Sequence, residues 1–281
     1  QKRIYCNQNL QQEYEYDVEG RVIRITTPQG IINYAYSPVT DRKVMTWTGE
    51  TWETRDNEFE YLYDDLGQLS SVITRKRNGY PVEGLLDEAV IYAYNENGSL
   101  KSIKYPNGNH CVYWYDALDQ ISQMANFSAV QADPDNPNSA QILSQFEYAY
   151  YADGQKASVA ETVGGLTRTV NWKYDNLNRL MEETVAGEYT NRYQYDLSGN
   201  RRFLRNELDQ ILVEYTYNPQ DHLLTEVSSG STISYFYDEN GSLIERVYGT
   251  NRGVDPNDQY IYNLQNQMAG FIPVGGSIVS Y

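Results

Sequence analysis

The sequence contains only two cysteines and two histidines in 281 residues. Cys6 and Cys111 lie far apart in the chain and fit neither a disulfide framework nor a metal site with paired ligands. His110 precedes Cys111 in an expected strand, with no acidic or amide partner in a recognisable motif. His222 lies beside an expected turn residue. Because no acid, base and nucleophile converge, we expect no enzyme, no catalytic residue, no metal site and no cofactor.

Basic side chains are also scarce. The 22 lysines and arginines stand against 38 aspartates and glutamates, which gives a net charge of −16. Nucleic acids and anionic membranes bind through cationic side chains, so we expect neither as a partner. The one basic cluster, Arg75 to Arg77, precedes an Asn-Gly pair and is expected to form a solvated hairpin tip. No apolar run approaches the roughly 20 residues of a membrane helix, so we expect no membrane insertion by this segment.

Alanine and leucine are too thinly spread for a helical bundle, whereas tyrosine is abundant. The chain has 28 tyrosines against 6 phenylalanines and 4 tryptophans. Tyrosine and threonine favour strands, and frequent Asn-Gly pairs favour tight hairpin turns. The composition therefore indicates an all-β protein.

Most of the tyrosines belong to one repeated motif, aromatic-x-Tyr, which is followed by a turn. Its eleven copies start at Tyr14, Tyr34, Tyr61, Tyr92, Tyr113, Tyr148, Trp172, Tyr193, Tyr215, Tyr235 and Tyr260. We number each copy from this first aromatic residue, so that the second aromatic residue is at position three. Side chains alternate along a strand, so both aromatics point to one face and are expected to stack with those of neighbouring copies, as Tyr193 and Tyr195 would.

Positions four and seven carry residues suited to a turn. Position four is Asp or Asn in most copies and can bond backbone amides two residues on, while the Gly, Asp or Asn at position seven tolerates positive φ. The expected turn residues are Asp17, Gly20, Asp64, Gly67, Asn95, Gly98, Asp116, Asp119, Gly154, Asp175, Asn178, Asp196, Gly199, Asp221, Asp238, Gly241 and Asn266. The copy at Tyr34 departs from the pattern, because Asp41 comes one residue late.

A second turn often closes the unit, so each repeat is predicted to be a hairpin that leads directly into the next. About eleven such units, about 22 strands, would form one array over residues 1–281. So long an antiparallel sheet is expected to coil into a spiral or partial shell. Longer intervals predict insertions near 47–58, 76–89, 125–141 and 249–259.

These units resemble the Rhs or YD repeat, as PNGNHCVYWYDALDQI from Pro106 and YQYDLSGNRR from Tyr193 illustrate. The family includes bacterial Rhs toxins, wall-associated toxins, insecticidal toxin complex B and C components, and teneurins. The resemblance implies a hollow shell that encloses a C-terminal toxin domain. The expected partners are then the rest of the shell and that domain, and the expected location is secreted or at a cell surface, most simply of a bacterium.

Two departures limit what the resemblance implies. Toxin-bearing relatives end the repeats with a DPxGxxD-like autocleavage element, whereas DPND from Asp255 to Asp258 lacks the glycine and lies between repeats. No toxin domain follows, and the first residues, QKRIYCNQNL, contain no initiating methionine. We therefore predict a non-catalytic wall segment, a fragment of a larger shell and too short to enclose a folded domain alone.

A binding module is the alternative function. Exposed aromatic side chains can stack on sugar rings, and the insertion near 47–58 holds two tryptophans. Trp47 and Trp52 are the candidate surface contacts for a cell-surface carbohydrate or receptor.

Overall fold

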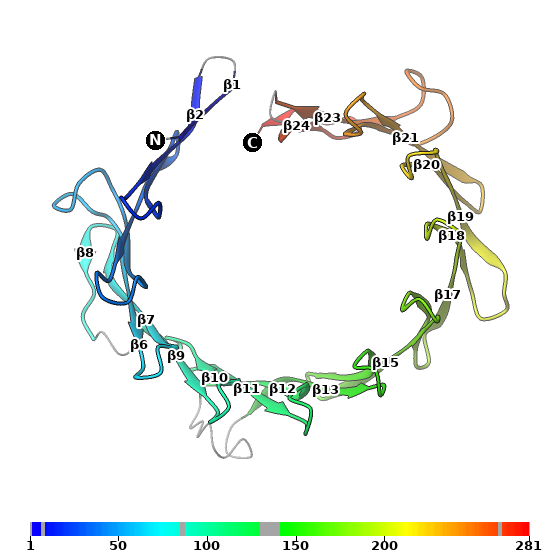
Figure 1. The fold of residues 1–281 in the computed structure, drawn as a ribbon. Coiled ribbons are helices and arrows are strands. Elements are labelled where there is room, and N and C mark those ends of the chain that lie inside the picture. Colours follow the sequence, from blue (N-terminus) through cyan, green and yellow to red (C-terminus); the bar gives the residue numbers. More distant parts are fainter. Residues whose placement is uncertain (1, 7–8, 85–87, 130–140, 264–265, 281) are drawn as a thin grey trace. The chain divides into compact units, whose positions relative to one another are not determined.

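The computed structural model describes residues 2–6, 9–84, 88–129, 141–263 and 266–280, and among them no residue is helical. The described residues form 25 strands, which pair antiparallel. Figure 1 shows them as successive hairpins. The prediction of an all-β chain of tandem hairpins is confirmed. The eleven predicted hairpins account for β2 to β7 and β9 to β24, while β1, β8 and β25 are additional.

The strands follow one another closely along the chain. They are β1 (Lys2–Cys6), β2 (Asn9–Tyr16), β3 (Val22–Thr27), β4 (Gly30–Tyr36), β5 (Lys43–Thr48), β6 (Glu58–Tyr63), β7 (Leu69–Arg77), β8 (Tyr80–Pro81), β9 (Ala89–Tyr94), β10 (Leu100–Lys104), β11 (His110–Tyr115), β12 (Ile121–Phe127), β13 (Ile142–Tyr150), β14 (Lys156–Val163), β15 (Leu166–Tyr174), β16 (Leu180–Val185), β17 (Tyr189–Tyr195), β18 (Arg201–Arg205), β19 (Ile211–Tyr217), β20 (Leu223–Ser228), β21 (Ser231–Tyr237), β22 (Leu243–Val247), β23 (Asn257–Tyr262), β24 (Met268–Ile272) and β25 (Val279–Ser280).

The chain divides into two compact units. The first comprises Gln1–Ala149 and Ala160–Thr167, and the second comprises Tyr150–Val159 and Arg168–Tyr281. In the first unit each strand from β1 to β7 pairs with the next, β7 also pairs with β8 and β9, and the series continues to β13. In the second unit β15 to β25 pair in the same successive way.

Pairing between strands puts the two aromatic residues of a copy on one face, which we call the tyrosine face. Tyr193 lies opposite Leu204 and Tyr195 lies opposite Arg201, with a register shift between Gln194 and Tyr195. The same shift precedes the position-three tyrosine in other copies, for example between Trp114 and Tyr115. A bulge of this kind accommodates the extra turn residue and strengthens the local twist.

The opposite face holds the small hydrophobic core of the first unit. Val112, Ala125 and Phe127 are buried there, with Trp114 packed against them. His110 is also buried, and its ring stacks on Phe127 at 4.9 Å between centroids. Burial lowers the pKa of this histidine, which therefore contributes as a neutral aromatic ring.

The four predicted insertions fall at the following places. Residues 49–57 connect β5 to β6, β8 and residues 82–88 lie between β7 and β9, and residues 248–256 connect β22 to β23. In the 125–141 insertion, residues 125–127 belong to β12, and residues 130–140 lie outside the described part of the chain. The single array over 1–281 stays a prediction.

Candidate functional site

The repeated turn is the first element of the site, and Asp196 illustrates how it is built. The Asp196 amide donates to the carbonyl of Asn200 at 2.9 Å, and the Gly199 amide donates to the carbonyl of Asp196 at 3.2 Å. The Asn200 amide donates to Asp196 Oδ1 at 2.9 Å. The carboxylate therefore closes the same loop that the backbone bonds define, a type I turn with a bulge.

Asparagine performs the same task at position four. Asn218 Oδ1 accepts hydrogen bonds from the amides of Gln220 and His222 at 3.0 and 2.8 Å. One side-chain oxygen is enough, so a negative charge is not required.

Position seven has positive φ in each described copy that follows the pattern. This holds for Gly20, Gly67, Gly98, Asp119, Gly154, Asn178, Gly199, Asp221, Gly241 and Asn266. In the longer turn of the second copy the residue with positive φ is Asp41, at 56°. This turn is closed by the Asp41 amide bonding to the carbonyl of Ser37, one residue farther back than in the other copies.

In seven copies the tyrosine hydroxyl at position three joins the repeat to the preceding one. Tyr217 Oη donates to the carbonyl of Arg201, position nine of the copy before it, at 2.9 Å. The same bond runs from Tyr36 to Val22, Tyr63 to Lys43, Tyr94 to Leu69, Tyr115 to Leu100, Tyr195 to Leu180 and Tyr237 to Leu223, at 2.7 to 2.9 Å. Tyrosine is therefore needed for its hydroxyl as well as its ring. The sequence pattern alone does not indicate this bond.

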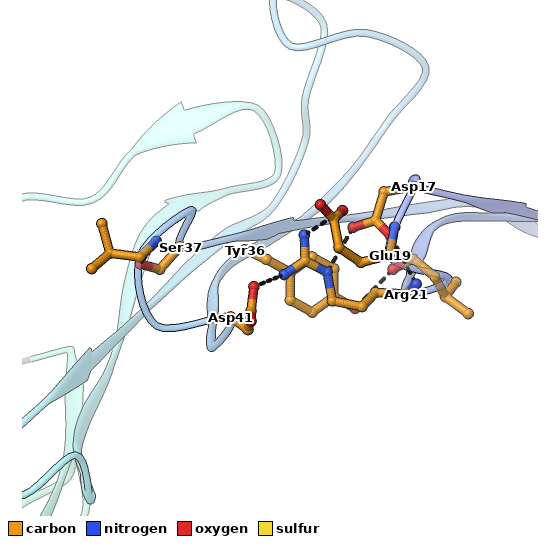
Figure 2. Close-up of polar contacts among 8 residues, drawn as sticks. Asp17, Glu19, Arg21, Tyr36, Ser37 and Asp41 are labelled. Atoms are coloured by element: carbon orange, nitrogen blue, oxygen red, sulfur yellow. Dashed lines mark hydrogen bonds and ion pairs between the residues drawn. The ribbon is translucent and has the colours of Figure 1, made fainter.

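The side chain at position eight makes the second connection between repeats, and Figure 2 shows it for Arg21. The Arg21 guanidinium donates to Asp17 Oδ2 at 2.7 Å in its own turn and to Asp41 Oδ1 at 2.6 Å in the next turn. It also lies over the ring of Tyr36, 4.7 Å from the centroid. One side chain thus contacts both the turn and the position-three tyrosine of the following repeat.

The electrostatics of this turn follow from the same contacts. Desolvation of Asp17 disfavours its ionised form, but hydrogen bonds from the side chain and amide of Arg21 outweigh it and hold the pKa of Asp17 below its usual value. At Asp175 the amide and side chain of Arg179 lower the pKa of the carboxyl in the same way. Both turn carboxylates are therefore ionised at neutral pH.

Other copies repeat the contact from position eight to position seven. Asn200 Nδ2 donates to Asp221 Oδ1 at 2.7 Å, and Gln68 Nε2 donates to the carbonyl of Gly98 at 3.4 Å. His222 stacks on Tyr237 at 4.7 Å and lies over Gly241. We call this series of turns, positions four to eight of successive copies, the turn row.

The stacking of Tyr193 and Tyr195 on neighbouring tyrosines is a wrong prediction, because arginines contact these rings instead. Arg201 lies 5.6 Å from the centroid of Tyr193 and 4.6 Å from that of Tyr215 in the next copy. Arg179 lies 4.5 Å from the centroid of Tyr195. A cation between two electron-rich ring faces is favourable by about 0.5–1 kcal/mol at an exposed site, so it replaces direct ring stacking here.

This repeat geometry agrees with a comparison of the sequence with known families. A family model described as Teneurin YD-shell matches residues 40–244, more than half of the chain. The chain belongs to the Teneurin YD-shell family. The resemblance to YD-repeat proteins drawn from the motif is confirmed.

Two curated relatives match nearly all of this YD-shell chain. Teneurin-m of Drosophila melanogaster is 21% identical over 274 residues, which cover 93% of the chain and 9% of Teneurin-m. The tRNA3(Ser)-specific nuclease WapA of Bacillus spizizenii is 24% identical over 291 residues, which cover 94% of the chain and 11% of WapA. The chain therefore spans about a tenth of the length of either relative.

A solved toxin structure has the same fold. In the Photorhabdus luminescens Tc holotoxin pore, one chain aligns with a TM-score of 0.53 and 13% identity, covering 97% of this chain and 17% of that one. At this identity the likeness establishes the fold alone.

The two candidate contact tryptophans of the YD shell lie against each other. Trp47 and Trp52 meet edge to face at 5.4 Å, and the Arg55 guanidinium lies 3.7 Å from the Trp52 ring centroid. Trp52 is 44% exposed, whereas Trp47 is partly buried in β5. Of the predicted pair, Trp52 is therefore the more accessible to a ligand.

Two of the insertions in the first unit, 47–58 and 76–89, contact each other, which the sequence did not indicate. The Gly79 amide donates to the carbonyl of Asp56 at 2.7 Å, and Lys76 Nζ donates to the carbonyl of Arg55 at 2.9 Å. The hairpin tip predicted from the basic cluster is thus anchored on the tryptophan-containing loop.

Asp258 in the DPND stretch is a structural residue that sequence reasoning missed. It is buried on the tyrosine face, where its carboxylate accepts hydrogen bonds from the Val274 amide at 2.9 Å, Tyr248 Oη at 2.8 Å and Arg246 Nε at 3.0 Å. Desolvation opposes its ionisation, but these bonds outweigh desolvation and lower its pKa. Its spacing, two residues before Tyr260, is the signal that places it on the tyrosine face.

The described part of the chain offers no metal-binding cluster, and its buried cysteine is not a reactive thiol. Cys111 is buried and burial raises its pKa, which disfavours the nucleophilic thiolate. The described residues contain no cluster of His, Cys, Asp and Glu able to hold a metal ion. Over the same ranges, no helix has the length and hydrophobicity to span a membrane.

Proposed function

We propose that the chain is a non-catalytic wall segment of a secreted YD-repeat shell, which helps to enclose or present a C-terminal toxin domain. The observation that carries the proposal is the tyrosine hydroxyl bond between consecutive repeats, as from Tyr217 to Arg201. Together with the contacts along the turn row, it joins neighbouring hairpins through side chains as well as through the sheet. A wall whose hairpins are held together in this way is what containment requires.

The proposed partners are the rest of the parent shell and the enclosed domain. Family membership and the fold shared with the Tc holotoxin chain support this proposal. Secretion by a bacterium is proposed on the same grounds, and WapA of Bacillus spizizenii is a bacterial relative.

The test uses the full parent protein and measures protection of its C-terminal domain from added protease. Tyr195→Phe combined with Tyr217→Phe removes two hydroxyl bonds and keeps both rings. We expect faster proteolysis of the C-terminal domain in this double variant. Tyr80→Phe is the control, because Tyr80 is 76% exposed in β8. A C-terminal domain that is equally accessible in the parent and in both variants would refute containment.

A binding role at Trp52 is the second candidate function, because this indole is exposed and held in place by Arg55 and Trp47. A pyranose ring could stack on it as sugars do on indoles elsewhere. Glycan-array binding that is lost in Trp52→Ala, and kept in Tyr80→Phe, would support this role. No binding by the unaltered chain would rule it out.

A further inference from the structure

The turn row of the first unit exposes aliphatic side chains at its tips. Val18, Leu66 and Leu118 occupy position five or six of their copies and are 97%, 79% and 75% exposed. Val39 in the longer turn of the second copy is exposed in the same way. Turn tips are normally polar, and at these exposures the three side chains have little packing against the described residues. In the second unit, Leu177 and Leu197 are likewise exposed at turn tips.

These aliphatic tips are surrounded by carboxylates. In the first unit the five turns from Asp17 to Gln120 that the structure describes contain eight acidic residues, Asp17, Glu19, Asp41, Asp64, Asp65, Glu96, Asp116 and Asp119, and two basic ones, Arg21 and Arg42. Arg21 is already paired with Asp17 and Asp41. The edge therefore combines exposed apolar groups with a strong excess of negative charge.

The exposed aliphatic tips are regularly spaced along this edge. Consecutive copies are two strands apart, so the tips of the first three turns repeat about every 10 Å along the edge. An α-helix presents residues seven apart at nearly the same interval, about 10 Å. A helix lying along the edge could therefore place one apolar side chain beside each tip.

We propose that the turn row of the first unit is a docking surface for a cationic amphipathic helix of a partner protein. Apolar residues repeated every seven positions contact Val18, Val39 and Leu66, and lysines or arginines beside them pair with the flanking carboxylates. Charge complementarity selects this occupant, because a second copy of the same edge would bring two acidic rows together. The proposal concerns a partner outside the wall and does not depend on containment of a toxin.

The test measures binding of a synthetic 22-residue helical peptide to the full chain by fluorescence anisotropy. The peptide carries leucine at the a and d positions of each heptad and lysine or alanine elsewhere. The competing probes are a peptide of the same composition with the leucines scrambled and one with glutamate in place of lysine. We expect binding of the first peptide only, weakened by added salt.

The tip variant combines Val18→Asn, Val39→Asn and Leu66→Asn. Asparagine is accepted in turns and the replaced side chains are exposed, so we expect an unchanged melting temperature. Peptide affinity should fall about tenfold or more as three apolar contacts are lost. The single variant Leu66→Asn should give a smaller loss in the same direction.

The matched control combines Leu166→Asn and Leu208→Asn. These leucines are 80% and 72% exposed, but they lie away from the turn row, Leu166 at the start of β15 and Leu208 in the turn between β18 and β19. We expect unchanged affinity for the peptide. Equal losses in the tip and control variants, equal binding of the scrambled peptide, or no binding at all would overturn the proposal. Self-association of the unaltered chain that the tip variant abolishes would also overturn it, by making a second copy the occupant.

Discussion

Glycine at position seven has two separate structural causes, which Gly67 illustrates. Its φ of 78° lies in the left-handed region that side chains with a Cβ rarely adopt. The guanidinium of Arg42, which follows Asp41 in the longer turn of the preceding copy, would also lie 1.9 Å from an added Cβ. Where the copies place aspartate instead, as at Asp41, the preceding arginine pairs with it. The residue with positive φ in one turn and the arginine of the preceding turn that contacts it therefore depend on each other.

This coupling makes a prediction for Gly67. We expect Gly67→Val to lower the free energy of unfolding by about 1 kcal/mol or more, because a β-branched residue is strained at this φ and displaces Arg42. Gly67→Asp should cost clearly less, because it gives Arg42 the partner that Arg21 has in Asp41. Urea unfolding of both variants measures the difference. Equal losses would contradict the coupling.

Substitutions of Asp196 test whether this carboxylate holds the turn or takes part in a reaction. We expect Asp196→Asn to be nearly neutral, since Asn218 makes the same amide contacts in its own copy. Asp196→Leu leaves the Asn200 amide without its side-chain acceptor and should cost about 1 kcal/mol. Thermal melts provide the measurement. Loss of the parent's activity in Asp196→Asn, at unchanged stability, would assign chemistry to this carboxylate.

At the scale of the hairpin, the hydroxyl of the position-three tyrosine is the connection that can be removed alone. Tyr217→Phe should destabilise the chain by about 1 kcal/mol and speed amide hydrogen exchange in the hairpin of β19 and β20. The ring remains, so packing is preserved. Tyr80→Phe is the control, and exchange that accelerates equally in both variants would show that this hydroxyl is not the connection.

The hairpins themselves could be predicted from the sequence, because turn chemistry and strand alternation are local. The position of Asp41 and the Gly residues at the turns followed from the need for positive φ. The bonds between repeats could not be predicted, since residues such as Tyr217 and Arg201 become neighbours only once the strand register is known. The short strand β8 and the contact of Gly79 with Asp56 depend on how two insertions meet, which periodicity does not encode.

For the whole molecule, the abundance of tyrosine predicts sensitivity to alkali. Desolvation raises the pKa of Tyr215, Tyr217 and Tyr237, among others, above the ordinary value of 10.0. A group with a raised pKa in the folded state contributes stability that is complete below about pH 10 and is lost as the pH rises through the folded-state pKa. A phenolate also cannot donate the bond to the preceding repeat.

We therefore expect the free energy of unfolding to be nearly constant from about pH 8 to pH 9.5 and to fall steeply above about pH 10. Urea unfolding over this range, with phenolate absorbance recorded in parallel, measures it. Constant ionic strength separates this effect from general screening. An unchanged midpoint up to about pH 12 would show that the tyrosine hydroxyls contribute little to the folded state.

The direction of the tyrosine bonds has a consequence for biosynthesis. In each of the seven position-three pairs given above, the hydroxyl belongs to the later repeat and the carbonyl to the earlier one, as from Tyr115 to Leu100. One other hydroxyl, that of Tyr151 at position four, donates forward to the carbonyl of Trp172. As the chain leaves the ribosome, each new hairpin therefore meets an acceptor that has already been made. The two partners of such a bond are close in sequence, so the bond can form during synthesis without residues farther toward the C-terminus. The hairpins can thus fold one after another in the order in which they are synthesised. Any later segment of the parent protein would then emerge next to hairpins that are already folded.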